Sequence, residues 1–183
     1  MSFLGGNLLL AAPHELDPNF VDTVILVVEH SERGVVGLIL NRPREASRRF
    51  FQEGRVAQPF PAKMKLYFGG PVTGPIMAIH TEASMAERGV LPGVYFSSNE
   101  TTIRALVQQA KRPFKVFTGY AGWTPGQLKK EIELGVWRVV PGTAEAVFSN
   151  NSQLWQNLYR RGFELQLREM LALKYLPADP MLN

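Results

Sequence analysis

The stretch that decides the fold is GYAGWTPGQL, residues 119–128, where the sequence changes from strand character to helix character. The apolar and aromatic residues of 114–120 are typical of a β-strand. Thr124 and Gln127 then have the spacing of a helix capping box, and Pro125 occupies the first helical position. Trp123 and Leu128 stand at the two positions of a hydrophobic staple. We therefore expect a strand over 114–120 joined to a helix over 124–134.

Glycines ahead of a helix also occur in phosphate-binding loops, so this stretch has an alternative interpretation. Pro125 has no N–H to donate, and the Thr124 side chain would occupy another amide of the first turn. The glycine spacing matches neither Gly-x-Gly-x-x-Gly nor the P-loop. The structural interpretation is therefore favoured over anion binding.

Outward from this joint, short apolar runs bounded by turn residues predict further strands. They lie at residues 7–12, 23–29, 35–41, 65–68, 76–80, 94–97 and 137–140. Periodicity predicts helices over 44–53, from Ser97 to the residue before Pro113, over 151–161 and over 167–175, and Ser97 and Glu100 have capping-box spacing. Strands cluster early and helices late, without regular alternation, which predicts an α+β fold with a mixed or antiparallel sheet.

A chain of 183 residues has the size of one domain with a sizeable core. We expect residues 1–183 to form a single compact domain, with 177–183 as a loose tail because it contains two prolines. The sequence has no cysteine, which excludes disulfides, thiolate nucleophiles and cysteine-ligated metal sites. Apolar runs such as 24–28 and 35–40 are far shorter than a membrane span, and no basic region precedes the apolar N-terminus. We expect a cytoplasmic protein that does not bind membranes.

Basic residues are unevenly distributed, although the net charge is only +4. Residues 42–65 contain seven Arg and Lys against two Glu, and residues 104–130 contain six against no acid. Such asymmetry attracts anionic partners when the basic stretches share a face. Weak nucleic-acid binding through 42–65 and 104–130 is therefore an alternative function. The sequence has no helix-turn-helix, RNA-binding sheet signature or zinc module, so nucleic acid is not the expected partner.

Several linked blocks of the sequence resemble the AlgH/YqgE family of small bacterial proteins. Beside 119–128, the matching blocks are residues 8–13 with Phe20, residues 37–43 (GLILNRP), residues 69–72 (GGPV), His80, Glu131 and Trp137. The resemblance implies a compact α+β fold with a bent, barrel-like sheet and helices packed around it. It also implies a proposed link to transcriptional control, with no assigned enzymatic activity. Lys129 departs from the pattern, because the family tends to have Glu at this position.

Two pairs of residues are candidates for anion binding. Asn41 and Arg42 stand where a buried strand emerges, and Pro43 restricts Arg42 to an extended conformation, so Arg42 could hold a carboxylate or phosphate. The alternative is that Asn41 caps a turn and Arg42 pairs with an internal acid. Gly69 and Gly70 could expose amides to an anion or form a tight connection between strands. In both cases the structural interpretation is favoured.

His80 is the best single candidate for proton transfer, because histidine titrates near neutral pH. No nucleophile or carboxylate partner is evident, so a hydrogen-bonded structural histidine is the favoured interpretation. The three histidines, at positions 14, 30 and 80, are too widely spaced to form a metal-binding pair on one helix, and serine-nucleophile signatures are missing. We expect neither a metal nor a cofactor.

Two functional hypotheses follow from these observations. The first is a non-catalytic regulatory or protein-interaction module, with a binding surface formed by Asn41, Arg42, Gly69, Gly70, Tyr120 and Trp123. The second is an enzyme that acts on an anionic small molecule, with His80 as acid or base and Arg42 as the anion holder. It predicts that Asn41, Arg42 and His80 line one concave pocket.

Overall fold

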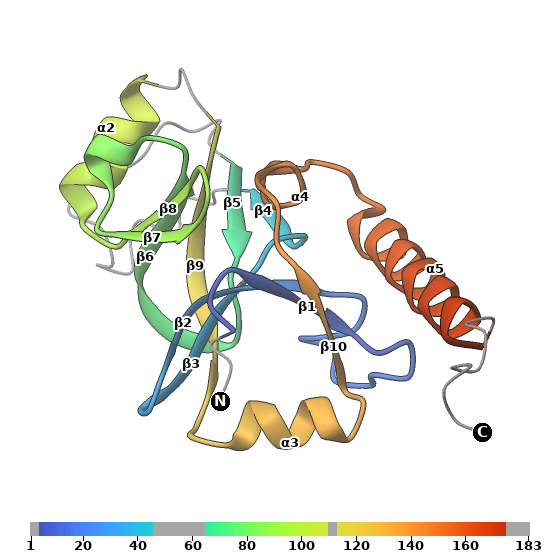
Figure 1. Ribbon diagram of the computed structural model, residues 1–183. Helices are drawn as coiled ribbons and strands as arrows, with labels where there is room; N and C mark the ends of the chain where they lie inside the picture. Colours follow the sequence, from blue (N-terminus) through green and yellow to red (C-terminus); the bar gives the residue numbers. More distant parts are fainter. Residues whose placement is uncertain (1–3, 46–64, 110–112, 175–183) are drawn as a thin grey trace.

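Figure 1 shows the computed structural model of the chain, which describes residues 4–45, 65–109 and 113–174. The described strands are β1 (Asn7–Ala11), β2 (Val24–Ser31), β3 (Gly34–Ile39), β4 (Pro43–Glu45), β5 (Lys65–Phe68), β6 (Val72–His80), β7 (Arg88–Leu91), β8 (Val94–Ser97), β9 (Phe114–Trp123) and β10 (Trp137–Pro141). The described helices are α2 (Glu100–Gln109), α3 (Gln127–Glu133), α4 (Ala144–Phe148) and α5 (Leu154–Lys174), with a 3-10 turn at Ala83–Met85.

The strands form one bent sheet in which β9 is the central strand. Neighbours in the order β10-β1-β2-β3-β9-β6-β8-β7 pair antiparallel. β9 is long enough to pair with two strands in succession on the side opposite β6, with β5 in parallel through residues 116–118 and with β3 through residues 121–123. β4 extends this branch by pairing with β5. The predicted α+β fold with a mixed, bent sheet is confirmed.

The sheet curls into a half-barrel whose two ends approach each other (Figure 1). A methyl group on Gly142, just after β10, would lie only 2.1 Å from the carbonyl oxygen of Gly6 and 3.0 Å from Leu91 at the end of β7. Arg88 of β7 also reaches Glu29 of β2, with 2.6 Å between nitrogen and oxygen. Strands at opposite ends of the order are therefore in contact.

The main hydrophobic core fills the inside of the half-barrel. It contains side chains from one face of the strands and is closed off by α4 and α5. Its buried residues include Leu8, Leu26, Leu38, Ile79, Phe117, Val147 of α4 and Leu154 of α5. Two smaller clusters lie on the other face, where α3 covers one through Leu128 and α2 covers the second through Ile103. Because apolar layers lie on both faces, strands such as β1 and β2 have continuous apolar sequences.

The joint at 119–128 begins its helix later than the sequence predicts. β9 continues to Trp123, and α3 starts at Gln127. Gly126 has φ = 80°, and the Gln127 N–H donates to the Thr124 carbonyl at 3.0 Å, so residues 124–127 form a type II β-turn with Pro125 in its second position. Only half of the predicted capping box exists, in which the Thr124 N–H donates to Oε1 of Gln127 at 3.0 Å. The predicted N-cap at Thr124 was therefore wrong.

Other helix boundaries also differ from their predictions. Asn99 caps α2 in place of Ser97, because its Oδ1 accepts the Thr102 N–H at 3.1 Å. α5 continues through Gly162, so the helices predicted over 151–161 and 167–175 are one. Of the helix predicted over 44–53, residues 44–45 belong to β4; 46–53 and the predicted tail 177–183 lie outside the described residues. No helix in the described part of the chain has both the length and the apolar character that a membrane crossing requires.

Candidate functional site

The glycines of two sequence blocks lie against each other where the chain leaves β5 and crosses β9. Gly69 is hydrogen-bonded into the sheet, because its N–H donates to the Thr118 carbonyl at 2.9 Å. A methyl group on Gly69 would lie 2.3 Å from the Gly119 oxygen, and one on Gly70 would lie 2.2 Å from the carbonyl carbon of Tyr120. Both glycines are buried. They therefore form the close backbone crossing that the structural interpretation predicts.

Asn41 and Arg42 bind backbone groups of the segment that leads into β2. The Asn41 Oδ1 accepts the Val24 N–H at 3.0 Å, and its Nδ2 donates to the Asp22 carbonyl at 2.7 Å. The Arg42 guanidinium donates to the carbonyl of Val21. Asp22 has φ = 52°, which is uncommon outside glycine, and these bonds fix the backbone on both sides of it. Asn41 thus holds a turn, while Arg42 binds a backbone carbonyl where an internal acid was expected.

One carboxylate joins two indole rings beside α3. The Oε2 of Glu131 accepts the Nε1–H of Trp123 at 2.8 Å and that of Trp137 at 2.7 Å, while Oε1 accepts an amide N–H of Gln127 at 2.8 Å. The two indole rings meet edge to face, with 5.9 Å between their centres. Trp123 is buried in this network, so its role is to hold α3 against the sheet.

Tyr120 is half-buried, and its ring occupies space that two glycines leave free. A methyl group on Gly74 would lie 2.9 Å from the ring, and one on Gly122 would lie 3.2 Å from it. The ring therefore covers the start of β6 and part of β9, and any larger residue at Gly74 would displace it.

His80, the predicted acid or base, is fully buried at the end of β6. Its Nδ1 accepts the Glu82 N–H at 3.3 Å, so Nε2 carries the proton and donates to the Ser97 hydroxyl at 3.0 Å. Ser97 in turn donates to the Met85 carbonyl at 2.7 Å. Burial lowers the pKa of His80, which favours this neutral form. His80 is therefore a hydrogen-bonded structural histidine with both ring nitrogens in use.

The structure brings some of the predicted residues together and separates others. Those around the crossing of β5 and β9 are Asn41, Arg42, Gly69, Gly70 and Tyr120. His80 lies about 20 Å from Tyr120 along β9, because His80 pairs with Phe114, which is six positions before Tyr120 on that strand. The pocket that would join Asn41, Arg42 and His80 does not form in the described residues. Binding of a partner by Asn41, Arg42 and Tyr120 stays a prediction.

Lys115 of β9 is a buried cation that the sequence showed only as part of a basic stretch. It is 3% exposed, and its Nζ donates to the carbonyls of Ser149 at 2.7 Å and Leu40 at 3.2 Å. The ammonium also lies 4.7 Å from the centre of the Tyr67 ring. Because these acceptors are neutral and burial disfavours the charged form, the pKa of Lys115 is lowered to about 8.

We expect the stability of the protein to rise with pH through the titration of Lys115. The pKa is 10.5 in the unfolded chain and about 8 in the folded one, so between these values the unfolded chain binds more protons. The free energy of unfolding should gain about 2 kcal/mol from about pH 8 to 9.5. Tyr67, whose pKa burial raises from 10.0, titrates above this window.

Urea unfolding across this pH range gives the free energy of unfolding of the wild type and of Lys115→Met. The effect is the difference between the two proteins in how this free energy changes with pH. Lys65→Met, which removes an exposed lysine, is the matched control and should follow the wild type. A Lys115→Met variant whose stability gains as much with pH as that of the wild type would contradict the assignment.

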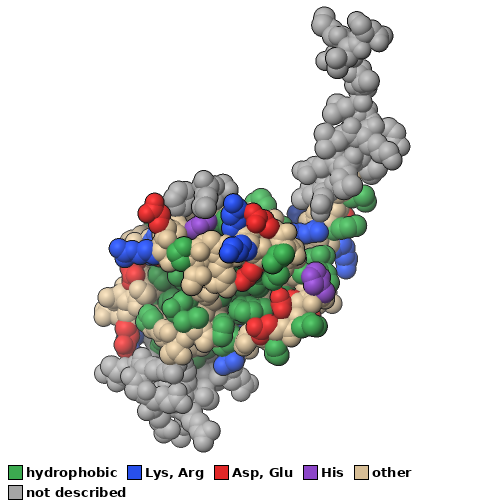
Figure 2. All heavy atoms as spheres, turned by 90° about the horizontal axis from the view of Figure 1, so that it is seen from below, with side chains coloured by type: hydrophobic (Ala, Val, Ile, Leu, Met, Phe, Trp, Pro, Cys, Tyr) green, Lys and Arg blue, Asp and Glu red, His purple; other side chains and the backbone are tan. Residues whose placement is uncertain are grey.

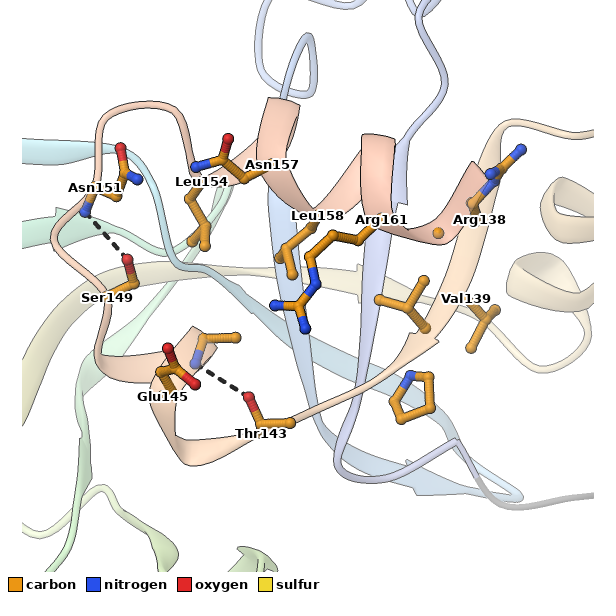
Figure 3. Close-up of a pocket in the computed structure, with 14 residues that line it drawn as sticks. Arg138, Val139, Thr143, Glu145, Ser149, Asn151, Leu154, Asn157, Leu158 and Arg161 are labelled. Carbon is orange, nitrogen blue, oxygen red and sulfur yellow. Dashed lines mark hydrogen bonds between the residues drawn. The ribbon is translucent and has the colours of Figure 1, made fainter. Parts of the chain in front are cut away.

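A groove of about 740 Å³ lies between β10, α4 and the first half of α5 (Figure 3). Its apolar residues include Val139, Val140, Leu154 and Leu158. In Figure 3, Leu158 and Arg161 point from α5 toward β10. None of the residues predicted from the sequence to form a site lines this groove.

Contacts made by the first turns of α5 hold this helix beside β10. The Trp155 indole donates to the Ala11 carbonyl at 2.9 Å and stacks on Tyr159, with 5.1 Å between ring centres. The Arg138 guanidinium lies 4.8 Å from the centre of the Tyr159 ring. Gly162 faces the strand closely, since a methyl group there would lie 3.6 Å from Cδ of Arg138. The helix is thus fixed along the last strand of the sheet, and the groove lies between them.

The groove has an excess of positive charge. Nη1 of Arg138 is buried and has no hydrogen-bond partner among the described residues. Arg161 is exposed, and no described carboxylate forms an ion pair with it. Glu145 is the one acid that lines the groove. It lies in the first turn of α4, after the last residue of β10, whereas Arg138 lies near the first residue of that strand (Figure 3). The lining of the groove therefore carries two arginines against one glutamate.

Several described cations of the two basic stretches are used within the fold. Lys115 is buried, Arg104 pairs with Glu100 at 2.6 Å, and Lys129 pairs with Glu133 at 3.7 Å. Residues 46–64 of the first stretch lie outside the described part. α2 and α3 lie at opposite ends of the sheet in Figure 1, and the face in Figure 2 intersperses basic and acidic side chains. Within the described ranges, no group of three His, Cys, Asp or Glu could hold a metal ion.

The sequence contained one signal for the groove that was missed. Leu154, Leu158 and Arg161 follow one another at i, i+4 and i+7, which places them on one face of a helix. This spacing predicts an apolar stripe with a cation at its end. It does not show that the stripe faces an edge strand.

Comparisons with known proteins agree with this architecture. The family model described as AlgH-like matches residues 8–164. A UPF0301 protein of Myxococcus xanthus is 34% identical over 165 residues, which cover 87% of this chain and 91% of the relative. A UPF0301 protein of Chlorobaculum tepidum is 33% identical, with 85% of this chain and 84% of the relative covered.

Solved structures are similar over nearly the same range. The solution structure of the AlgH protein from Pseudomonas aeruginosa has a TM-score of 0.71 and 28% identity, covering 97% of this chain and 96% of that one. A crystal structure of a Corynebacterium diphtheriae protein has a TM-score of 0.68 and 25% identity, with 88% of each chain covered. Since the family model covers most of the sequence and relatives above 30% identity cover most of its length, the chain belongs to the AlgH-like family.

Proposed function

We propose that this chain is a non-catalytic protein-interaction module that regulates a partner by binding it in the groove between β10 and α5. The observation that carries the proposal is the composition of this groove. It combines apolar side chains, Val140 and Leu158 among them, with two arginines that lack carboxylate partners in the described residues. Interfaces between proteins commonly have an apolar centre with arginine at its edge.

The hypothesis of an enzyme that uses His80 and Arg42 has less support. His80 is fully buried with both ring nitrogens hydrogen-bonded, and Arg42 donates to the Val21 carbonyl. Direct nucleic-acid binding has less support too, since Lys115 is buried and Arg104 and Lys129 pair with acids. Both alternatives would require groups that the described fold already uses.

A photo-crosslinking experiment tests the proposed function. A benzophenone amino acid in place of Asn157, which lines the groove, should form an adduct with a specific protein in cells, identified by mass spectrometry. The matched control places the same group at Gln156, the neighbouring exposed position outside the groove. If position 157 gives no adduct, or if positions 156 and 157 give the same amount of adduct, the groove is not a binding surface.

A further inference from the structure

β10 is the last strand of the sheet, and one row of its backbone groups points away from β1. The pairing of β1 and β10 aligns Leu10 with Arg138 and Leu8 with Val140. The Ala12 N–H donates to the Val136 carbonyl in the same register. Hydrogen bonds in an antiparallel pair occur at every second residue, so residues 136, 138 and 140 bond to β1. The N–H and C=O of Val139 therefore point outward.

The outward edge of β10 borders the groove. Val139 and Val140 both line it, with α5 on the opposite side. No other described strand pairs with β10, and no described backbone group hydrogen-bonds to the outward N–H or C=O of Val139. An unpaired strand edge of this kind is a template for another strand.

The lining of the groove has an excess of positive charge. Arg138 stands near the start of β10, with Nη1 buried and unpaired among the described residues, and Arg161 faces the groove from α5 (Figure 3). Glu145 follows the end of β10. Guanidinium groups pair best with carboxylates. Arg161, which is exposed and lines the groove, therefore fits an acidic side chain.

We propose that the partner binds as an extended acidic segment that adds one strand to the edge of β10. This inference rests on the proposed function, because it names the kind of partner that the groove would take. Backbone bonds to Val139 would align the segment, alternate apolar side chains would contact Val140 and Leu158, and a carboxylate would pair with Arg161. β10 has five residues, or about 17 Å, so the segment is about five residues long.

Selection from a phage-displayed library of random heptapeptides tests the chemistry of the partner. Wild-type protein should enrich peptides with Asp or Glu beside alternating apolar residues. Selection on Arg161→Glu should not enrich them, while Arg160→Glu, an exposed neighbour outside the groove, should enrich them as the wild type does. The proposal is wrong if acidic peptides are enriched to the same degree by the wild type and by Arg161→Glu.

Binding of the most enriched peptide, synthesised with a fluorescent label, tests the strand addition itself. We expect Arg161→Glu to weaken binding about 10-fold and Arg160→Glu less than about 2-fold. Methylation of the peptide's alternate backbone nitrogens should also weaken binding about 10-fold, because it removes N–H donors while keeping the charge. Val139→Pro removes the outward N–H at an edge position where proline is tolerated, and should have the same effect.

The contrary results are distinguishable. The methylated peptide could bind as tightly as the unmethylated one, or inorganic phosphate could displace the peptide at a concentration similar to that of the peptide. Either result would show that the arginines hold an anion without strand addition. If adducts at position 157 persist while the peptide effects are absent, the interaction module stands and its partner has another chemistry. If those adducts are also absent, the proposed function itself is wrong.

Discussion

Replacing Gly119 with alanine should destabilise the protein by about 4 kcal/mol, a large part of the stability of a typical domain. Gly119 has φ = 69°, and a methyl group on it would lie 2.4 Å from the carbonyl oxygen of Gly70 and 2.9 Å from that of Val72. Both obstacles are backbone atoms of the facing segment, so no side-chain rotation relieves them. The free energy of unfolding in urea measures the loss.

Gly93→Ala is the matched control for this prediction. Gly93 has nearly the same conformation, with φ = 76°, but nothing lies within 4 Å of an added methyl group. It should therefore show the conformational cost alone, about 1 kcal/mol. A Gly119→Ala variant that loses no more stability than Gly93→Ala would mean that the crossing adjusts to an extra methyl group, and that the glycines there are not required by packing.

The glycine crossing shows how far the sequence could predict this fold. The strands at 65–68 and 94–97 were predicted with their observed limits, because apolar runs and turn residues mark them locally. The contact between Gly70 and Tyr120 joins residues 50 positions apart, so no local pattern reveals it. Gly69 and Gly70 were predicted as a tight connection between strands and do join β5 to β6, but the segment of β9 that they cross was not predicted.

Two boundary errors have local causes. Pro125-Gly126 is typical of a type II turn, and this turn displaced the predicted N-cap because Gly126 adopts a positive φ that is unfavourable for other residues. Gly162 suggested a helix end, since glycine costs about 1 kcal/mol inside a helix. The helix nevertheless continues through Gly162, where it packs against Val140 and Arg138 of β10.

The candidate site could be predicted only in part. Arg42 and His80 were chosen for their chemistry, but the structure uses their side chains for backbone and hydroxyl hydrogen bonds. The groove depends instead on where α5 lies relative to β10, and the contact that fixes it joins Trp155 to Ala11, 144 residues apart. Helix periodicity can show which face of α5 is apolar, but not which strand it faces.

Glu131→Leu should cost about 4 kcal/mol of stability, because it removes the acceptor of both indoles. The same oxygen, Oε2, accepts from Trp123 and Trp137, and Oε1 accepts from Gln127. Each buried donor left without an acceptor costs about 1 to 3 kcal/mol, and leucine at this position replaces none of the three bonds. Trp123 and Trp137 come from strands on either side of α3, so the loss should loosen the helix from the sheet.

Glu131→Gln separates the hydrogen bonds from the packing. Its carbonyl oxygen can accept from both indoles, whereas its amide group meets the amide of Gln127, so one bond of three is lost and the cost should be about 1 kcal/mol. The indole N–H signals in an NMR spectrum locate the effect. Those of Trp123 and Trp137 should move upfield in Glu131→Leu but little in Glu131→Gln, while that of Trp155, which donates to the Ala11 carbonyl, should not move in either. Equal losses in both variants would contradict this account, because glutamine keeps both indole hydrogen bonds and leucine keeps neither.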